Sequence, residues 1–465
     1  MTTESYISPI GTRYKGVCSR IWSEEIKRRL WRYHWLNSLE ILYRMGILDD
    51  TDDDIGAINR LKILLLEHDM SHQYKERVKS REAEIGHDIV AELEVFQEQV
   101  SKTINSSRLH AVQTSSNIKD MAFIVQTIIS LHRISELAHQ LVGDILGVKK
   151  DGLMQGRTHL QKADITTYKY RMTVYATRIM DNLNDMVGFV GDYEATKHPY
   201  GLFGGPTGTY GNLVEVSRIN VSSLRKVRSI LRSGDPSFQT YDRSFDLKTA
   251  QILSRMGSTL YKLAQDLRLM LAFGDLRFVN RKDEIQGSSS LPTKENPIFA
   301  EKACALLRHL PALEREIWDY SSHSMLERTL DDSAVRRYAL PEMFQAMEEA
   351  IQAISKEVQS VEYNDETKID LSHSTATRVQ SLIFAKGYAG VSREFLSRVD
   401  WSDKQKVKNL LDACGITYPD IPGYPHHLNL VNRVATERYE QFRMPRANLF
   451  SEGVKRLTIG GYQWL

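Results

Sequence analysis

The chain has 465 residues, of which 42% are hydrophobic and 26% charged, a composition typical of globular proteins and too apolar for a disordered one. Sixty-one Lys and Arg against 59 Asp and Glu leave a net charge of +2, so no strong overall field attracts polyanions. No local basic patch indicates binding to nucleic acid or to a membrane surface. The length favours about three domains.

The cysteines and the N-terminal segment indicate the compartment. Cys18, Cys304 and Cys414 lie far apart and form no CxxC motif, which disfavours a disulfide scaffold or a structural zinc site and fits a reducing compartment. The N-terminal segment lacks the apolar region of a secretory signal, and no apolar run reaches the roughly 18 residues that a membrane span requires. We therefore expect a soluble cytoplasmic protein with no membrane segment.

Helical periodicity dominates the chain. The acidic run Asp49–Asp54 is predicted to be a solvated turn that caps a helix rather than a metal site. Apolar residues then recur at helical spacing between Met121 and Ile145, and again between Leu253 and Met270. No proline interrupts either seam, so helices of about 25 residues or more are expected, packed at shallow angles in a bundle. Alternating strand patterns are nearly absent, and the predicted fold class is all-α.

Three loops rich in Gly, Pro or Ser interrupt the helical pattern, at residues 198–212, 286–297 and 415–425. Long loops in a helical protein are uncommon and are often functional. The changes of pattern predict an N-terminal helical domain over 1–111, a central long-helix domain over 112–360 and a C-terminal helical domain over 361–465. The last of these carries a divergent tail.

The loop 286–297 is the most informative stretch. Gly287 is followed by three serines, and Lys294 and Asn296 add a cation and an amide two residues apart. Such a segment can close over an anionic substrate and bring a hydroxyl to the reacting carbon. Taken by itself, it is equally a polar connection between two helices.

The whole pattern Gly-Ser-Ser-Ser-Leu-Pro-Thr-Lys-Glu-Asn-Pro resembles the GSSxMPxKxNP signature of the fumarase/aspartase superfamily, with Leu291 in the Met position. That superfamily removes fumarate from substituted succinates by anti-elimination. Further segments resemble elements of the adenylosuccinate lyase family, and their order along the chain is the same. These segments are 8–14, 109–115 followed by Asp120, 155–161, 205–212, 239–246 and 327–337.

The resemblance implies the catalytic pair. Ser288 corresponds to the base that takes a proton from the carbon beside a carboxylate, and His159 to the acid that protonates the departing nitrogen on the opposite face. A serine serves as base only where lid closure excludes solvent and nearby donors stabilise the alkoxide, whereas imidazole titrates near neutrality. Lys294 and Asn296 correspond to the groups that stabilise the extra charge of the aci-carboxylate.

The resemblance also implies a substrate-binding set. Hydroxyls of Thr114, Ser115 and Thr158 correspond to donors for the second carboxylate, and His87 with Asp88 to a pair that positions the substrate. Gln239 corresponds to a polar contact near the base or the succinyl group. The phosphate-binding set corresponds to Arg13, Tyr14, Arg328, Ser333 and Arg337, with Lys302 at a position that is arginine in the animal enzymes.

Arg328 and Arg337 are nine residues apart, which is about 180° around a continuous helix. They cannot face one phosphate from such a helix, so we expect a loop or break within 329–333. Besides Leu291, and Val112 and Gln113 in place of the usual small residues, four positions that are usually basic depart from the family pattern. Gly86 stands where arginine is common, Glu295 and Phe299 replace basic residues, and Lys302 replaces an arginine.

The resemblance implies a homotetramer of three-domain, all-helical subunits, with each active site built from three subunits. It also implies a nucleotide substrate, since the family cleaves adenylosuccinate to AMP and fumarate and also cleaves the succinylated aminoimidazole carboxamide ribotide (SAICAR). Neither reaction needs a metal or an organic cofactor. Two alternatives remain, a related C–N lyase that acts on another N-succinyl compound and a catalytically idle structural relative. A nucleic-acid-binding module is suggested only by the basic stretch 225–232.

Overall fold

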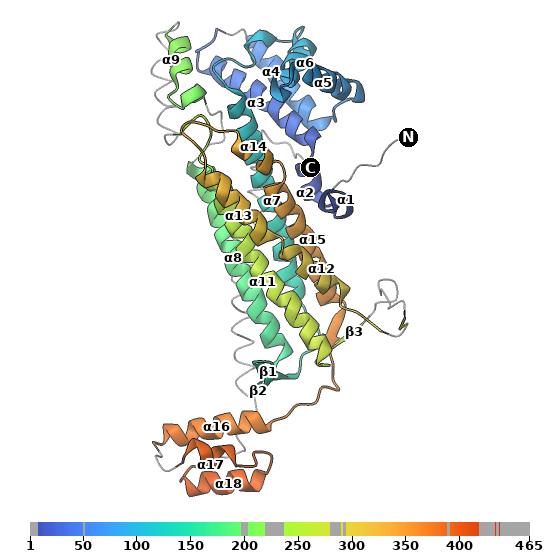
Figure 1. The fold of residues 1–465 in the computed structure, drawn as a ribbon, viewed down its shortest axis with the longest axis vertical. Coiled ribbons are helices and arrows are strands. Elements are labelled where there is room, and N and C mark those ends of the chain that lie inside the picture. Colours follow the sequence, from blue (N-terminus) through green and yellow to red (C-terminus); the bar gives the residue numbers. More distant parts are fainter. Residues whose placement is uncertain are drawn as a thin grey trace.

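The computed structural model describes residues 8–49, 52–196, 203–218, 237–279, 290–291, 294–387 and 391–417, together with residues 433 and 437. The side chains of residues 52, 53, 66 and 192–196 are excepted. Nearly all the regular structure in these ranges is helical, which confirms the all-α class (Figure 1). No helix among the described residues is long and apolar enough to cross a bilayer.

The N-terminal helices pack around their own apolar cluster, which includes Trp35, Leu36 and Phe96. They lie at one end of the molecule, above the long helices in Figure 1. This cluster also takes in Ile118 and Ala122 from the first long helix, so the two parts share a core. The elements are α1 (Pro9–Arg13), α2 (Val17–Ile21), α3 (Glu24–Arg44), α4 (Asp52–Glu67), α5 (His72–Ile85), α6 (Asp88–Val100) and the 3-10 turn η1 (Ser106–Arg108).

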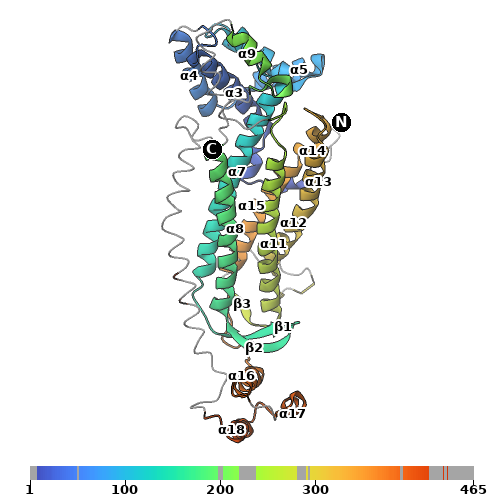
Figure 2. The same ribbon diagram turned by 90° about the vertical axis from the view of Figure 1, so that its left-hand side faces the viewer.

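Long helices form the centre of the molecule and run side by side (Figures 1 and 2). Helices α7 (Ser115–Leu146), α8 (Tyr168–Thr196) and α11 (Ser244–Ala272) contain 32, 29 and 29 residues. The lengths of α7 and α11 confirm the long helices expected from the two apolar seams. Along the second seam, Leu253, Leu260 and Leu267 are fully buried. A capping box of Thr114 and Asn117 begins α7.

Shorter helices complete the bundle. Helix α15 packs against α7, α11 and α12, and α13 packs against α11. Gly257 allows the close approach of α11 and α13, because a Cβ at that position would lie 2.6 Å from Leu310. These helices are α12 (Ile298–Leu307), α13 (Leu310–Ser322), α14 (Asp331–Arg336) and α15 (Ala339–Gln359), while η2 (Gly205–Thr207) and α9 (Gly211–Ser217) lie beside the N-terminal helices.

Two small antiparallel pairs, which the sequence pattern did not predict, lie at the far end of the bundle. Strands β1 (Leu153–Thr158) and β2 (Gln161–Thr167) form a hairpin, and β3 (Leu276–Phe278) pairs with β4 (Val361–Tyr363). The turn of the hairpin is His159-Leu160, and both residues have positive φ, 54° and 61°. That geometry is typical of a two-residue hairpin turn, although Gly, Asn or Asp is usual there.

A small C-terminal group of helices lies below this hairpin in Figure 1. It consists of α16 (Ser372–Ala385), α17 (Arg393–Ser397) and α18 (Lys404–Ala413), which pack around Val379, Ile383 and Leu411. Arg378 of α16 is 3.3 Å from Asp164 of β2, which joins the two parts. The domain boundaries at 111/112 and 360/361 stay a prediction.

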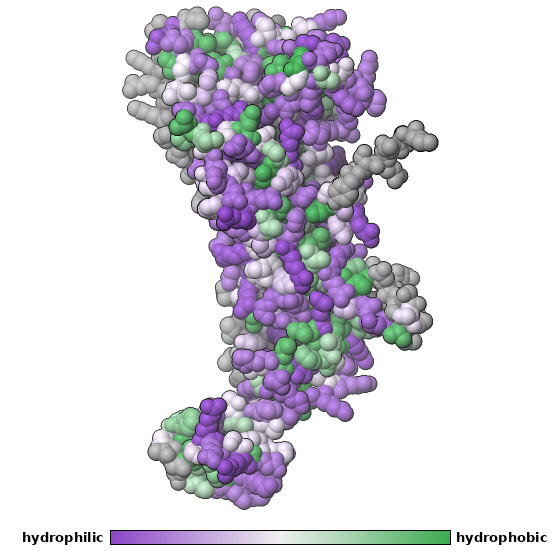
Figure 3. All heavy atoms as spheres, viewed as in Figure 1, coloured by the Kyte–Doolittle hydropathy of each residue, from purple (hydrophilic) through white to green (hydrophobic). Residues whose placement is uncertain are grey.

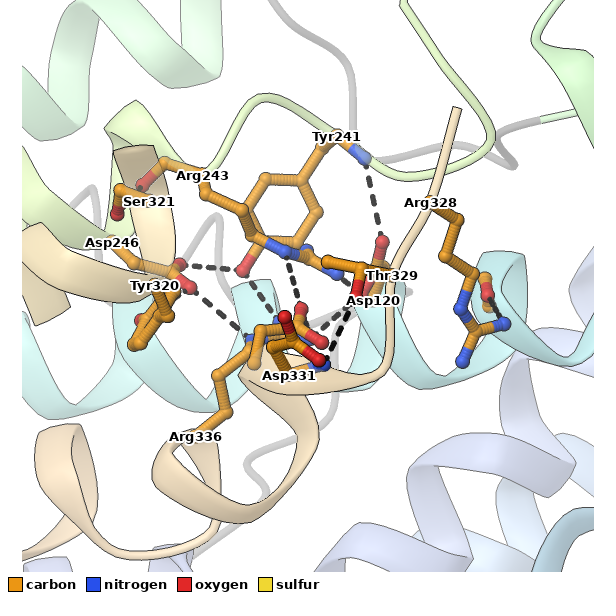
Figure 4. Close-up of polar contacts among 12 residues, drawn as sticks. Asp120, Tyr241, Arg243, Asp246, Tyr320, Ser321, Arg328, Thr329, Asp331 and Arg336 are labelled. Carbon is orange, nitrogen blue, oxygen red and sulfur yellow. Dashed lines mark hydrogen bonds and ion pairs between the residues drawn. The ribbon is translucent and has the colours of Figure 1, made fainter. Parts of the chain in front are cut away.

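A buried ionic cluster holds α14 against the other end of the bundle (Figure 4). Arg336 donates to Asp120 at 3.0 Å, to Asp246 at 3.2 Å and to the Tyr241 hydroxyl at 2.7 Å. Tyr241 and Tyr320 both donate to Asp246. Burial raises the pKa of each tyrosine well above its usual range, so both remain neutral donors.

Arg243 extends the cluster to the first turn of α14. It donates to Asp120 at 3.0 Å and to Asp332 at 2.9 Å, and its own carbonyl accepts a hydrogen bond from Ser321. A helix of six residues is unstable alone, so these long-range contacts fix its position. Arg328 precedes α14, which begins at Asp331. The break expected between Arg328 and Ser333 is therefore present.

Replacing Arg336 with Met is expected to destabilise the protein by about 3–5 kcal/mol, because it leaves two buried carboxylates without their shared cation. The matched control is Arg315→Met, which removes an exposed pair with Asp319 (3.1 Å) and is expected to cost less than about 1 kcal/mol. The measurement is the free energy of unfolding in denaturant. Equal losses for the two variants would contradict this role of the cluster.

Candidate active site

A cavity of about 180 Å³ opens where the N-terminal helices meet the central bundle. Trp22, Trp31 and Phe123 line it together with Leu330 and Pro341. It is smaller than the roughly 300–1,000 Å³ of most small-molecule sites, so it forms one part of a site rather than a complete one. The charged residues of its wall are Glu24, Lys27, Asp88, Lys119, Asp120, Arg243, Arg328, Asp332, Arg336 and Arg337.

Arg328 lies in this wall with only neutral hydrogen-bond partners. Its guanidinium donates to the Ser116 hydroxyl and, at 3.3 Å, to the Gln239 amide oxygen. Gln239 also accepts from Ser116 at 3.4 Å. A half-buried guanidinium without a carboxylate partner favours an external anion, because burying an unpaired charge is costly. Two residues that the sequence suggested, Arg328 and Gln239, thus meet at one point.

Helix α14 brings two more of the suggested phosphate residues to the same cavity. Ser333 and Arg337 both belong to its lining. The Arg337 side chain is 68% exposed, and its Nη2 lies 3.9 Å from the nearer carboxylate oxygen of Asp88. A hydroxyl and a guanidinium here can bind oxygen atoms of an anion.

Asp88 begins α6 on the opposite wall. Its carboxylate accepts from the backbone N–H of Ile89 at 2.8 Å and from Lys119 Nζ at 2.7 Å. Burial raises the pKa of Asp88, but the hydrogen bond and charge of Lys119, together with the Ile89 N–H, lower it, and the pKa lies below its usual value. His87 is exposed, with Nδ1 3.6 Å from Asp88.

Sequence reasoning missed Ser116 and Lys119 as members of this wall. Ser116, Lys119, Asp120 and Phe123 all line the cavity, at the i, i+3, i+4 and i+7 spacing of one face of α7. The signal was available, since this face starts directly after the suggested residue Ser115.

Four residues suggested for the reaction itself or for binding the succinyl carboxylates lie at the far end of the bundle. His159 and Thr158 are exposed at the tip of the β1–β2 hairpin. Lys294 and Asn296 line a second hollow of about 840 Å³, together with the end of α11 and β3. Ser288 lies outside the described residues.

The length of α11 separates the two groups. Asp246 at its start belongs to the ionic cluster under the first cavity, while Phe273, just past its end, lies 4.0 Å from the Arg157 guanidinium of the hairpin. Twenty-seven residues of helix at 1.5 Å each span about 40 Å. Within one chain, His159 and the Arg328 cavity therefore cannot contact the same small substrate.

The remaining suggested residues do not line the first cavity. Arg13 is exposed and Tyr14 is half-buried near α15, while Thr114 and Ser115 cap and begin α7. Lys302 of α12 pairs with Glu349 of α15 at 2.6 Å, so its charge is already neutralised within the bundle. Among the described residues, no group of three His, Cys, Asp or Glu side chains is placed to hold a metal ion.

Comparisons with known proteins agree with the fold and the motifs. Residues 55–309 match the model of a family described as "Lyase". The adenylosuccinate lyase of Saccharomyces cerevisiae is 27% identical over 73% of this chain and 70% of its own length. That of Schistosoma mansoni is 29% identical over 74% of this chain and 70% of its own.

Solved structures show the same fold. The chain resembles a fumarate lyase from Mesorhizobium sp. BNC1 with a TM-score of 0.64 and 17% identity, covering 98% of this chain and 99% of that one. The β-carboxy-cis,cis-muconate cycloisomerase of Acinetobacter calcoaceticus also gives a TM-score of 0.64, with 16% identity over 91% and 98% of the two chains. The family match extends over more than half of the sequence, and the chain therefore belongs to this lyase family.

Proposed function

We propose that the protein is a cytoplasmic adenylosuccinate lyase of purine biosynthesis. It eliminates fumarate from adenylosuccinate to give AMP and, by the same chemistry, from SAICAR to give the aminoimidazole carboxamide ribotide. The relatives that carry the name adenylosuccinate lyase support this proposal, as do the motifs that the chain shares with that family.

The observation that carries the proposal is the environment of Arg328. A half-buried guanidinium held by two neutral partners lies beside Ser333 and Arg337 in one cavity. Guanidinium groups and a hydroxyl suit the oxygen atoms of a phosphate. A substrate without a phosphate would leave these groups unused, which disfavours the alternative of an unphosphorylated N-succinyl compound.

In the proposed reaction, Ser288 takes the proton from the carbon next to a carboxylate, and His159 donates a proton to the nitrogen as the C–N bond breaks. Lys294 and Asn296 stabilise the carboxylate that carries the developing negative charge. The exposed position of His159 on a hairpin tip suits this role, because the imidazole is free to reach a neighbouring molecule.

The separation of about 40 Å along α11 supports the sharing of sites between subunits. We propose that the His159 hairpin of one subunit reaches the Arg328 cavity of another in a homotetramer. Figure 3 shows apolar surface on the lower part of the bundle over α11 and α12, near which Leu269 and Phe273 are 36% and 40% exposed. Such surface marks interfaces.

A catalytically idle relative is the second candidate. The retention of Ser288 and His159 in the sequence favours an enzyme instead. The basic stretch 225–232, which suggested nucleic-acid binding, lies outside the described residues.

The experiment that tests the function is an absorbance assay of the purified protein with adenylosuccinate and SAICAR, with argininosuccinate and aspartate as controls. Turnover of a succinylated nucleotide and none of the controls is expected. Turnover of argininosuccinate or aspartate alone would contradict the proposal, and so would no turnover of any of the four.

Replacing His159 with Gln is expected to lower kcat by about 10²–10⁴-fold, because the amide cannot protonate the leaving nitrogen. The matched control is His323→Gln, an exposed histidine that lies outside the first cavity and is expected to leave kcat unchanged. Steady-state kinetics with adenylosuccinate provide the measurement. A kcat within a few-fold of the wild type in His159→Gln would exclude His159 as the acid.

Replacing Arg328 with Met is expected to raise KM for adenylosuccinate by about 10–100-fold with a smaller change in kcat, since a charge-assisted contact to the phosphate is lost. Arg315→Met again serves as the surface control. If kcat fell while KM stayed constant, Arg328 would act on the reacting bond rather than on the phosphate.

A further inference from the structure

We propose that Lys119 is a third cation of the phosphate site, in addition to Arg328 and Arg337, and that it determines the preference for a phosphorylated ligand. This inference rests on the proposed function. Lys119 belongs to none of the motifs through which the sequence resembles its family.

The position of Lys119 places it in the cavity wall. It lies on the face of α7 that also presents Ser116, the hydroxyl to which Arg328 donates. Residues three apart on a helix are neighbours, so Lys119 and Ser116, which binds Arg328, lie on the same side of the cavity. The Lys119 side chain is 29% exposed and lines the cavity.

The charges around the cavity are unequal. Asp88 is shared by Lys119, whose Nζ is 2.7 Å away, and by Arg337 at 3.9 Å. Six cationic and four anionic side chains line the cavity as a whole, which leaves a net charge of +2. A phosphate monoester carries about −1.5 to −2 at neutral pH, so a phosphate group matches this excess better than a single carboxylate does.

The remaining charges of the wall are already paired. Arg243 and Arg336 are held by Asp120 and Asp332 in the ionic cluster. Lys27 and Glu24 form an ion pair with each other. The excess positive charge therefore resides on Lys119, Arg328 and Arg337, with Asp88 among them.

The end of α5 explains why a lysine on α7 has this role. Gly86 stands at the position where arginine is common in the family, and it ends α5 with a φ of +69°. This backbone conformation is strained for any residue that has a side chain. The backbone before Asp88 is thus unsuited to an arginine here. Lys119 instead supplies a cation beside Asp88 from the neighbouring helix.

The test is the binding of AMP to the full-length protein, measured by calorimetry for the wild type, Lys119→Met, Lys119→Arg and a control. The control is Lys75→Met, whose Nζ donates to Glu25 at 2.6 Å on the same group of helices but outside the cavity. Lys119→Met is expected to weaken AMP binding by about 10–100-fold, because one charge-assisted contact is lost. Lys119→Arg is expected to recover most of the affinity, and Lys75→Met to match the wild type.

Adenosine and fumarate identify the group that Lys119 contacts. The difference between AMP and adenosine affinities is expected to shrink in Lys119→Met, while inhibition by fumarate stays at the wild-type level. Thermal unfolding of each variant shows whether a loss of binding comes from a loss of folding. If Lys119→Met fails to fold, the AMP affinity of Lys119→Arg, which keeps the positive charge, is compared with the wild type.

Wild-type AMP affinity in Lys119→Met would overturn this inference and leave the proposed function intact. Weakened fumarate inhibition with unchanged AMP binding would also overturn it, because Lys119 would then contact a carboxylate. Failure of the wild type itself to bind AMP would overturn both proposals.

Discussion

Unbroken long helices impose the constraint on which the proposed site depends. A helix rises 1.5 Å per residue, so α11 alone separates its two ends by about 40 Å. The Arg328 cavity lies at one end and the His159 hairpin at the other. If both groups act on one substrate, different subunits must supply them, and the active site is then a property of the assembly rather than of the chain.

The rigidity of the phosphate half has its own physical basis. Helix α14 has six residues and would not persist by itself. Arg336 and Arg243 connect it through Asp120, Asp246 and Asp332 to α7 and α11. Each buried charge in that cluster has a partner. Among the described cations of the cavity wall, Arg328 is the one whose hydrogen-bond partners are neutral.

Much of the fold could be predicted from the sequence. The apolar seams located α7 and α11, because a helix that is buried along one face repeats apolar residues at a helical period. The β1–β2 hairpin could not be predicted in this way, since Leu153–Thr158 does not alternate and its turn lacks the usual Gly or Asn. The nine-residue spacing of Arg328 and Arg337 predicted the break before α14, because two arginines on opposite faces of one helix cannot reach the same ligand.

The site was only partly predictable. Motifs suggested Arg328, Gln239 and Asp88 separately. The structure places Arg328 and Asp88 in the wall of one cavity, with Gln239 bonded to Arg328. Lys119 lies on the helix face that begins after Ser115, but a lysine on a helix is usually solvated, and only the fold shows that its ammonium lies beside Asp88. The separation of His159 from Arg328 also depends on the three-dimensional arrangement, as sequence distance says nothing about which end of a bundle a loop occupies.

Intersubunit complementation tests the central claim most directly. The His159→Gln and Arg328→Met chains are co-expressed with different affinity tags, and hybrids that carry both tags are purified and assayed with adenylosuccinate. Activity is compared as kcat/KM, at adenylosuccinate concentrations below the wild-type KM, where both parents are expected to be slow. Because some hybrid sites combine an intact His159 with an intact Arg328 from different chains, we expect about a quarter of the wild-type kcat/KM, far above either parent. A hybrid kcat/KM no higher than that of either parent would show that one chain supplies both groups, which would contradict the account.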